Sequence, residues 1–139
     1  MGMAPNDFNQ QIIDEFRAKG GVVGGPFEGA PLLLLHHKGR KSGEGRVNPL
    51  AYQKVDKGWA VFASFAGAPV NPAWYYNVVA SPDTTIELGT ETLPVRAREA
   101  QGTERDAVWS KQKEVMPGFG DYEEKAGDRV IPVIVLEPR

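Results

Sequence analysis

The first apolar residues of the chain recur with the spacing of a helix. Residues 7–19 wound at 3.6 residues per turn bring four of them onto one face: Phe8, Ile12, Ile13 and Phe16. Asn6 is a suitable N-cap, and Gly20-Gly21 provides a stop signal. The pattern predicts an amphipathic helix over 7–19.

Short apolar runs separated by turn signals follow, and this arrangement is typical of strands. Residues 32–36 are too few for a helix and precede a glycine-bearing loop, from which residues 46–55 return. Asp56-Lys57-Gly58 then separates that run from residues 59–65. We predict three strands in an antiparallel meander.

The second half of the chain mixes both kinds of signal. Asn71 at the cap and Pro72 at the first helical position predict a short helix that ends at Ser81-Pro82. Residues 84–88 and 92–99 are predicted to pair as a hairpin. A polar helix is predicted over 103–115, and a last strand over 129–138.

Six strands without regular βαβ alternation favour a mainly β, α+β fold. We predict an antiparallel barrel with appended helices, because a closed barrel removes the edges that such hydrophobic strands expose. At 139 residues the chain is long enough for one core, so we expect a single domain over 1–139, with 1–22 as an N-terminal helix and linker.

Composition narrows the function. Sixteen basic and eighteen acidic side chains give a net charge of -2, which provides no overall field for nucleic acid. Without cysteine there is no disulfide, thiolate metal site or cysteine nucleophile, and we expect a cytoplasmic protein. No signal peptide or membrane-spanning run is visible.

The most informative stretch is the basic loop within "HHKGRKSGEGRVNP", residues 36–49. Its cationic side chains alternate with glycines, so charged groups and backbone amides can converge on a phosphate or carboxylate. The cations are Lys38, Arg40, Lys41 and Arg46. A solvated hairpin tip explains the loop equally well.

Two neighbouring features have two interpretations each. Asn48-Pro49 marks a bulge beside a binding site or simply an edge strand. Trp74 and Tyr75 open the short helix and could flank a planar ring, although on their own they favour core positions. His36 and His37 face opposite sides of a strand, which argues against a catalytic triad or a metal site, and we expect at least one of them to face solvent.

Three segments together resemble a known family. "GRKSGEGRVNPLAY", "FASFAGAPVNPAWYYN" and "FGDYEEKAGDRVIPVIVLEP" are similar, in order and spacing, to the deazaflavin-dependent nitroreductase family of actinobacteria, the split β-barrel F420-dependent quinone reductases. The similarity covers residues 32–139. It implies a split barrel that binds coenzyme F420, with the cofactor's phosphate and glutamate tail on the basic loop and its deazaflavin ring against the aromatic helix start.

The resemblance also implies a set of site residues. The phosphate region would contact Arg40, Lys41 and Ser42, and the next part of the cofactor Arg46, Val47, Asn48, Pro49 and Leu50. Further cofactor contacts would be Phe62, Ala63, Ser64, Phe65, Ala73, Trp74, Tyr75, Asn77 and Phe119.

The late aromatic segment would close the pocket over the acceptor, with Met116, Phe119 and Tyr122. Nitroimidazole-reducing relatives carry tyrosines at the positions of Met116 and Phe119, and only Tyr122 keeps its hydroxyl here, so reduction of nitroimidazoles is in doubt. Ser64 and Tyr122 are the candidates for hydrogen-bonding the acceptor.

The leading hypothesis is an oxidoreductase that uses reduced F420 to reduce a quinone or a similar electron-poor conjugated acceptor. Reduced deazaflavin carries its own hydride, which fits a sequence without a triad or a metal cluster. Three alternatives remain: a flavin mononucleotide enzyme on a related barrel, a non-catalytic F420 carrier, and a nucleic-acid-binding module, which the net charge disfavours.

Partners are less defined by the sequence. The predicted N-terminal helix carries Asp7, Asp14 and Glu15 against Arg17 and Lys19, so attraction to anionic lipid is not expected. Peripheral contact with the inner face of the cell membrane and the oligomeric state stay open.

Overall fold

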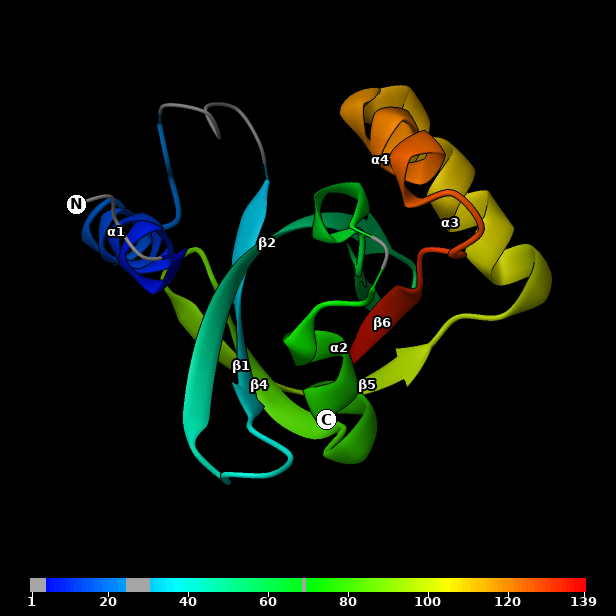
Figure 1. The fold of residues 1–139 in the computed structure, drawn as a ribbon. Coiled ribbons are helices and arrows are strands. Elements are labelled where there is room, and N and C mark those ends of the chain that lie inside the picture. Colours follow the sequence, from blue (N-terminus) through cyan, green and yellow to red (C-terminus); the bar gives the residue numbers. More distant parts are fainter. Residues whose placement is uncertain (1–4, 25–30, 69) are drawn as a thin grey trace.

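The computed structural model describes residues 5–24, 31–68 and 70–139. Six strands close into one barrel in the order β1-β2-β3-β6-β5-β4, and every neighbouring pair is antiparallel. The strands are β1 (Leu32–Lys38), β2 (Gly45–Val55), β3 (Gly58–Phe62), β4 (Asp83–Leu88), β5 (Glu91–Glu99) and β6 (Val133–Pro138). The predicted antiparallel barrel with appended helices, including its first three-strand meander, is confirmed (Figure 1).

Strand alternation divides the apolar residues between the barrel interior and its outer surface. On β1, Leu33 and Leu35 belong to the interior core, whereas Leu32 and Leu34 pack outward. On β6, Ile134 and Leu136 point inward, and the neighbouring valines point outward. The barrel therefore has apolar surface on both sides of its wall, and the helices cover the outer part.

Helix α1 (Pro5–Ala18) covers the outer surface of β1 and β2. Ile12, Ile13 and Phe16 are buried there, as the helical spacing predicts. The predicted start was wrong, because the helix already begins at Pro5 and Asn6 is therefore its second residue and not its N-cap; the side chains of Asn6 and Phe8 lie outside the described part of the structure.

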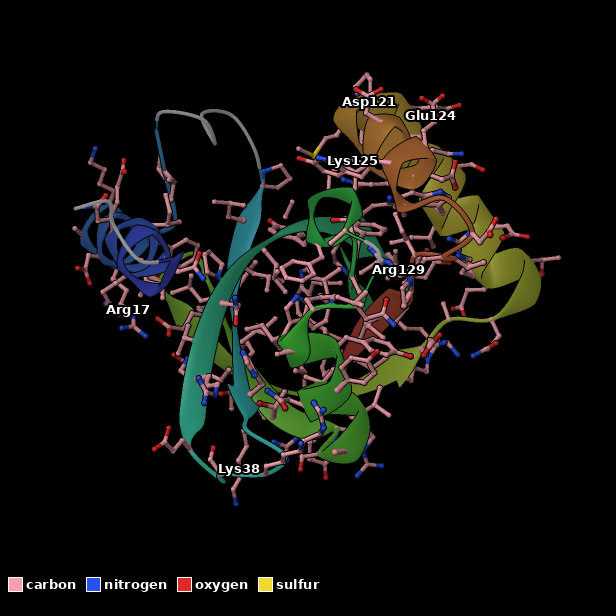
Figure 2. The ribbon with its side chains drawn as sticks, viewed as in Figure 1. Arg17, Lys38, Asp121, Glu124, Lys125 and Arg129 are labelled. Carbon is pink, nitrogen blue, oxygen red and sulfur yellow. The ribbon has the colours of Figure 1, made fainter. Side chains whose placement is uncertain are left out.

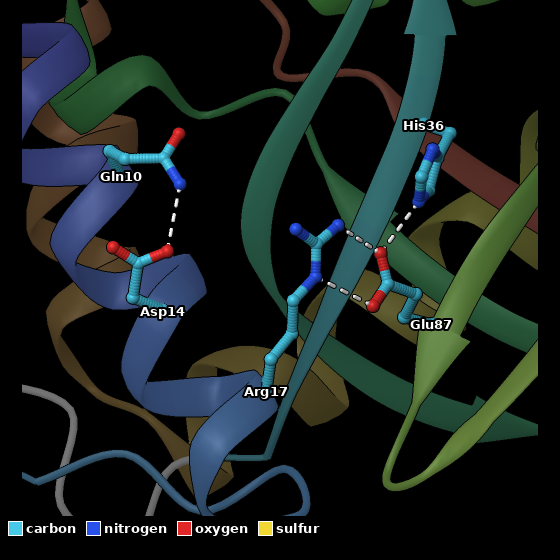
Figure 3. A network of polar contacts seen from close by, with 5 residues as sticks. All are labelled: Gln10, Asp14, Arg17, His36 and Glu87. Atoms are coloured by element: carbon cyan, nitrogen blue, oxygen red, sulfur yellow. Dashed lines mark hydrogen bonds and ion pairs between the residues drawn. The ribbon is translucent and has the colours of Figure 1, made fainter.

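A polar cluster fastens α1 to the barrel (Figure 3). The Arg17 guanidinium donates to both carboxylate oxygens of Glu87 on β4, at 3.0 and 2.6 Å, and His36 Nε2 lies 2.7 Å from the same carboxylate. The Arg17 hydrogen bond holds the pKa of Glu87 below its usual range, although partial burial acts against this. Glu87 therefore ties α1 to two strands of the sheet.

Helices α3 (Gly102–Val115) and α4 (Gly118–Ala126) cover the outer surface of β3 and β6, on the side of the barrel away from α1 (Figure 1). Trp109 of α3 and Phe119 of α4 meet Phe62 of β3 in this second outer core. The helix over 103–115 is confirmed, and α4 is an element that the sequence pattern did not predict.

Helix α2 (Ala73–Ala80) closes one end of the barrel, because Trp74 and Val78 belong to the interior core. Its predicted start was wrong by one residue. Pro72 is the N-cap, with an extended backbone, and the side chain of Asn71 accepts a hydrogen bond from Arg129 instead of capping the helix.

Two predicted strand boundaries were also wrong. The third strand ends at Phe62, not at residue 65, because the chain turns into the short helix η2 (Phe65–Gly67). The last strand begins at Val133 and not near residue 129. In the described part of the chain, no helix combines the length and apolar character needed to cross a membrane.

Candidate functional site

A cavity of about 1270 Å³ runs along β2, between α1 on one side and α2, α4 and the loop after β3 on the other. Strand β2 contributes side chains from both of its faces, since consecutive residues 46 to 51 all line the cavity. One end of the cavity is the basic loop, and the other is an aromatic wall.

The basic loop is shaped by short contacts within residues 39–44. Gly39 N–H donates to the carbonyl oxygen of Glu44 at 2.9 Å, and Gly43, with φ of +74°, donates back to Gly39 at 2.8 Å. A Cβ atom on Gly39 would meet Ser42 Oγ at 2.6 Å, so a larger residue there would have to displace the Ser42 side chain. The loop thus has a defined backbone instead of a loose hairpin tip.

The cations of the loop are only lightly neutralised. Arg46 lies 3.8 Å from the exposed carboxylate of Glu44, and Arg40 lies over the ring of Tyr76. Lys41 forms no ion pair with any described residue. Their charges are therefore available to an anion in the cavity.

A buried hydrogen-bonded chain connects the loop to β1, β2 and α2. Asn77 Oδ1 accepts from the backbone N–H of Arg40 at 3.1 Å, and Asn77 Nδ2 lies 3.0 Å from His37 Nδ1. The other ring nitrogen of His37 lies 2.7 Å from Asn48 Oδ1. Burial lowers the pKa of His37; the hydrogen bond to Asn48 acts against this, and the charge of Arg46 adds to the lowering, so the ring is neutral near neutral pH.

The opposite wall of the cavity is aromatic. Phe119 contacts the ring of Phe62 at a centroid distance of 5.6 Å and that of Tyr122 at 5.4 Å, both edge to face. Met116 adds an apolar side chain beside them. The Tyr122 hydroxyl has no hydrogen-bond partner among the described residues, so it is free to bind a ligand.

The loop after β3 is held from outside the cavity by Arg129. Its guanidinium donates to the carbonyl oxygens of Ala63, Ser64 and Ala68 at 2.9, 2.6 and 2.9 Å. Figure 2 shows Arg129 on the segment between α4 and β6, beside this loop. Phe65 follows with φ of +49°, which is unusual for a residue with a side chain. Ser64 and Phe65 both line the cavity.

The structure brings most of the predicted site residues to this one cavity. Those that line it are Arg40, Lys41, Ser42, Arg46, Val47, Asn48, Pro49, Leu50, Phe62, Ser64, Phe65, Ala73, Trp74, Asn77, Met116, Phe119 and Tyr122. Their roles in binding or catalysis stay predictions.

Two predicted contacts lie elsewhere. Ala63 is fully buried in the interior core. Tyr75 donates its hydroxyl to Glu99 on β5 at 2.5 Å, and burial, together with this carboxylate, raises the pKa of Tyr75 to about 12. Trp74 and Tyr75 therefore do not share the cavity.

Several lining residues were missed by the sequence analysis. Asn9, Gln10 and Ile13 of α1 form part of the wall. His37 does as well, and its signal was present: it continues the inward-facing series Leu33, Leu35, His37. Of the two histidines, His37 is buried and His36 is partly exposed. Within the described ranges, no three histidine or carboxylate side chains gather closely enough to hold a metal ion.

Residues 9–138 match the family model described as F420H(2)-dependent quinone reductase. The chain belongs to this family. Rv1261c of Mycobacterium tuberculosis, named F420H(2)-dependent quinone reductase, is 33% identical over 128 residues, which cover 89% of this chain and 85% of that protein. Rv3178 of the same organism, to which this name is given provisionally, is 41% identical over 109 residues, 78% of this chain and 91% of that one.

Solved structures agree with the membership of this quinone reductase family. An F420-H2-dependent reductase, FDR-A, superposes with a TM-score of 0.70 at 38% identity, over 77% of this chain and 94% of that chain. A second structure, described as a domain-swapped dimer, has a TM-score of 0.72 at 33% identity over 96% of this chain and all of that chain. The haem storage protein HutZ of Vibrio cholerae, at 15% identity, shares the fold alone, with a TM-score of 0.59.

Proposed function

We propose that this family member uses reduced coenzyme F420 as a hydride donor to reduce a quinone or a similar electron-poor conjugated acceptor. The observation that carries the proposal is the single cavity in which a basic loop and an aromatic wall face the same space. A cofactor with an anionic tail and a planar ring needs both kinds of surface, at opposite ends of one site.

The basic end suits the phosphate and the glutamate tail. Lys41 has no competing carboxylate among the described residues, and Arg46 has only the distant, exposed Glu44. The tightly bonded loop keeps the backbone near the ligand, which limits the ordering cost of binding. Arg40, Lys41 and Ser42 are the residues we assign to the phosphate.

The middle and far end of the cavity suit the deazaflavin ring and the acceptor. Trp74 is 5% exposed and lines the cavity from α2, next to Ala73, and Leu50 of β2 packs against the same interior core and also lines the cavity. In this proposal the part of the indole that borders the cavity is the apolar surface for the ring. We assign the ring to Trp74 and not to Tyr75, whose hydroxyl is bound to Glu99.

The bound cofactor supplies the hydride, and the side chains have three remaining tasks. They hold the acceptor within about 3–3.5 Å of the ring and exclude water from the site. They also support the negative charge that develops on an acceptor oxygen. The Tyr122 hydroxyl, without a protein partner in the described chain, donates to that oxygen, and Ser64 Oγ is the second candidate donor.

The wall composition favours a hydrophobic planar acceptor. Met116 and Phe119 present no hydroxyl, so a polar nitro group would find few donors beside Tyr122. A quinone needs only one oxygen to be stabilised at the moment of hydride transfer. We therefore propose that quinones are better acceptors than nitroimidazoles.

We also propose a cytoplasmic location, with contact at the inner face of the cell membrane. The absence of cysteine suits a reducing compartment, and a lipid-soluble quinone would enter the cavity from the membrane surface. Co-sedimentation with vesicles that contain menaquinone tests the membrane contact, and protein that stays in the supernatant contradicts it.

The deciding experiment has a binding step and a turnover step. Purified protein is titrated with F420 and, separately, with flavin mononucleotide, with fluorescence and calorimetry as readouts, and F420 should bind more tightly. Oxidation of reduced F420 is then followed by absorbance with menadione or a bicyclic nitroimidazole as acceptor. Tighter binding of flavin mononucleotide indicates the flavin enzyme, and binding without turnover of any acceptor indicates a carrier.

A further inference from the structure

The orientation of every group in the buried chain that contains His37 follows from one backbone donor. The N–H of Arg40 can only donate, so the Asn77 atom at 3.1 Å from it must be the carbonyl oxygen. Asn77 Nδ2 then faces His37 Nδ1 at 3.0 Å as a donor, and Nδ1 must accept. The proton of the neutral imidazole therefore resides on Nε2.

The same argument determines which atom of the Asn48 amide faces His37. His37 Nε2–H donates to Asn48 Oδ1 at 2.7 Å, so the amide nitrogen of Asn48 is the atom turned away from the histidine. In the described part of the chain nothing accepts a hydrogen bond from this nitrogen, and Asn48 lines the cavity. Two N–H donors are thus offered toward the cavity next to Arg46.

We infer that His37 is a positioning residue that acts through Asn48: it holds the Asn48 amide so that its N–H donors meet an acceptor oxygen of the bound cofactor. The inference rests on the proposed function, because it names F420 as the ligand. The oxygen lies between the phosphate, near Arg46, and the ring, near Leu50, since Asn48 stands between these two residues on β2. His37 need not touch the cofactor for this role.

The neighbouring histidine provides a matched control. His36 is on the same strand but faces the outer surface, where it lies 2.7 Å from Glu87 and does not line the large cavity (Figure 3). His36→Phe changes the same residue type one position away without reaching Asn48. A general effect of altering β1 would appear in both histidine variants, whereas the proposed effect appears only at His37.

A double-mutant cycle on F420 affinity tests the inference. The four proteins are the parent, His37→Phe, Asn48→Ala and the double variant. We expect His37→Phe to weaken F420 binding about tenfold in the parent, as for a lost hydrogen bond to the ligand, and less than about twofold when Asn48 is already alanine. His36→Phe should bind F420 like the parent.

The outcomes are distinct. Equal losses from His37→Phe in both backgrounds show that His37 acts without Asn48 and overturn the inference, while no binding of F420 by the parent overturns the proposed function and the inference with it. His37→Leu replaces His37→Phe in the cycle if the phenylalanine variant melts early. Nitrogen NMR of the parent protein gives an independent test, because it reports the tautomer of His37 without a variant at this position. A proton on Nδ1 of the buried histidine contradicts the inferred hydrogen-bond directions.

Discussion

The guanidinium of Arg129 donates a 2.6 Å hydrogen bond to the main-chain carbonyl oxygen of Ser64. A residue from the segment between α4 and β6 thereby fixes the part of the cavity wall that carries a candidate donor to the acceptor. The other acceptors of this guanidinium are also uncharged, and burial lowers the pKa of Arg129, which nevertheless remains far too high for the group to lose its charge. The position needs the planar fork of arginine.

Arg129→Lys should therefore destabilise the protein despite keeping the charge. A single ammonium cannot reach all four acceptors, and leaving partly buried carbonyls unpaired costs roughly 1.5–3 kcal/mol. Urea unfolding measures the loss. Arg96→Lys is the matched control, because Arg96 pairs with Asp83 on the exposed surface and should change the unfolding free energy little. Equal effects of the two substitutions would remove the special role of Arg129.

Lys41→Ala should weaken F420 binding and reduce its dependence on salt. A charge-assisted contact with the phosphate contributes roughly 1.5–3 kcal/mol, or about ten- to a hundredfold in affinity, and ions screen it. Titrations at low and high salt measure both quantities. Lys38→Ala is the control, since Lys38 lies at the end of the same hairpin but lines a separate, smaller cavity (Figure 2). Unchanged affinity in the Lys41 variant would take the loop out of the site.

Tyr122→Phe should lower turnover far more than cofactor affinity. The hydroxyl acts mainly when charge develops on the acceptor, and loss of such a donor costs about 2.7–4 kcal/mol in the transition state. The comparison of kcat with the F420 dissociation constant is the measurement. Tyr76→Phe, which removes the hydroxyl of an exposed tyrosine outside the cavity, should behave like the parent. A fully active Tyr122 variant would refute this donor.

Trp74 should report cofactor binding by fluorescence. It is the only one of the three tryptophans that lines the cavity. Trp59 packs against the interior core, and Trp109 lies in the outer core beneath α3 and α4. Addition of F420 should quench the emission, and Trp74→Phe should lose most of the quenching while it stays folded. Quenching of the same size in Trp74→Phe and in Trp109→Phe would mean that the ring does not lie against Trp74.

Acid should weaken the attachment of α1 through Glu87. The pKa of this carboxyl is lowered from about 4.5 by Arg17, so its stabilising contribution is complete above the unfolded value and is lost as the pH falls through the lower folded value. Unfolding free energies measured from about pH 6 to pH 3 should fall less steeply for Glu87→Gln than for the parent. Glu91→Gln, at an exposed position of the same hairpin, should follow the parent curve.

The barrel was predictable because its information is local. Alternation along each strand and turn residues between strands determine which elements form and how consecutive ones pair. The end of β3 was not predictable, since residues 63–65 read as strand. The turn that replaces it is held by local backbone hydrogen bonds to the carbonyls of Ser64 and Phe65 and by Arg129, far along the chain, which binds the carbonyls of Ala63 and Ser64. Helix α4 was hidden by Gly118 and Gly120, which lower helix propensity in any local assessment.

The site likewise combines features that the sequence indicates with features that depend on tertiary packing. The basic loop was recognisable from residue type and the late aromatic segment only from the family resemblance, and both line the cavity. Trp74 and Tyr75 were expected to act together, but adjacent residues on a helix point about 100° apart, so one enters the interior core and the other reaches Glu99. The wall formed by α1 depends on how the helix docks, which no local pattern states.

Because side chains along β2 point alternately to the two faces of the barrel wall, the strand offers two nearly independent sets of positions for engineering the cavity. Val47, Pro49 and Ala51 face the outer surface of the barrel, while Asn48 and Leu50 face its interior, and all five border the cavity. Libraries at the odd positions can reshape one wall while the even positions keep their contacts. An insertion of one residue would exchange the two sets at once, so lineages should diversify this strand by substitution and conserve its length.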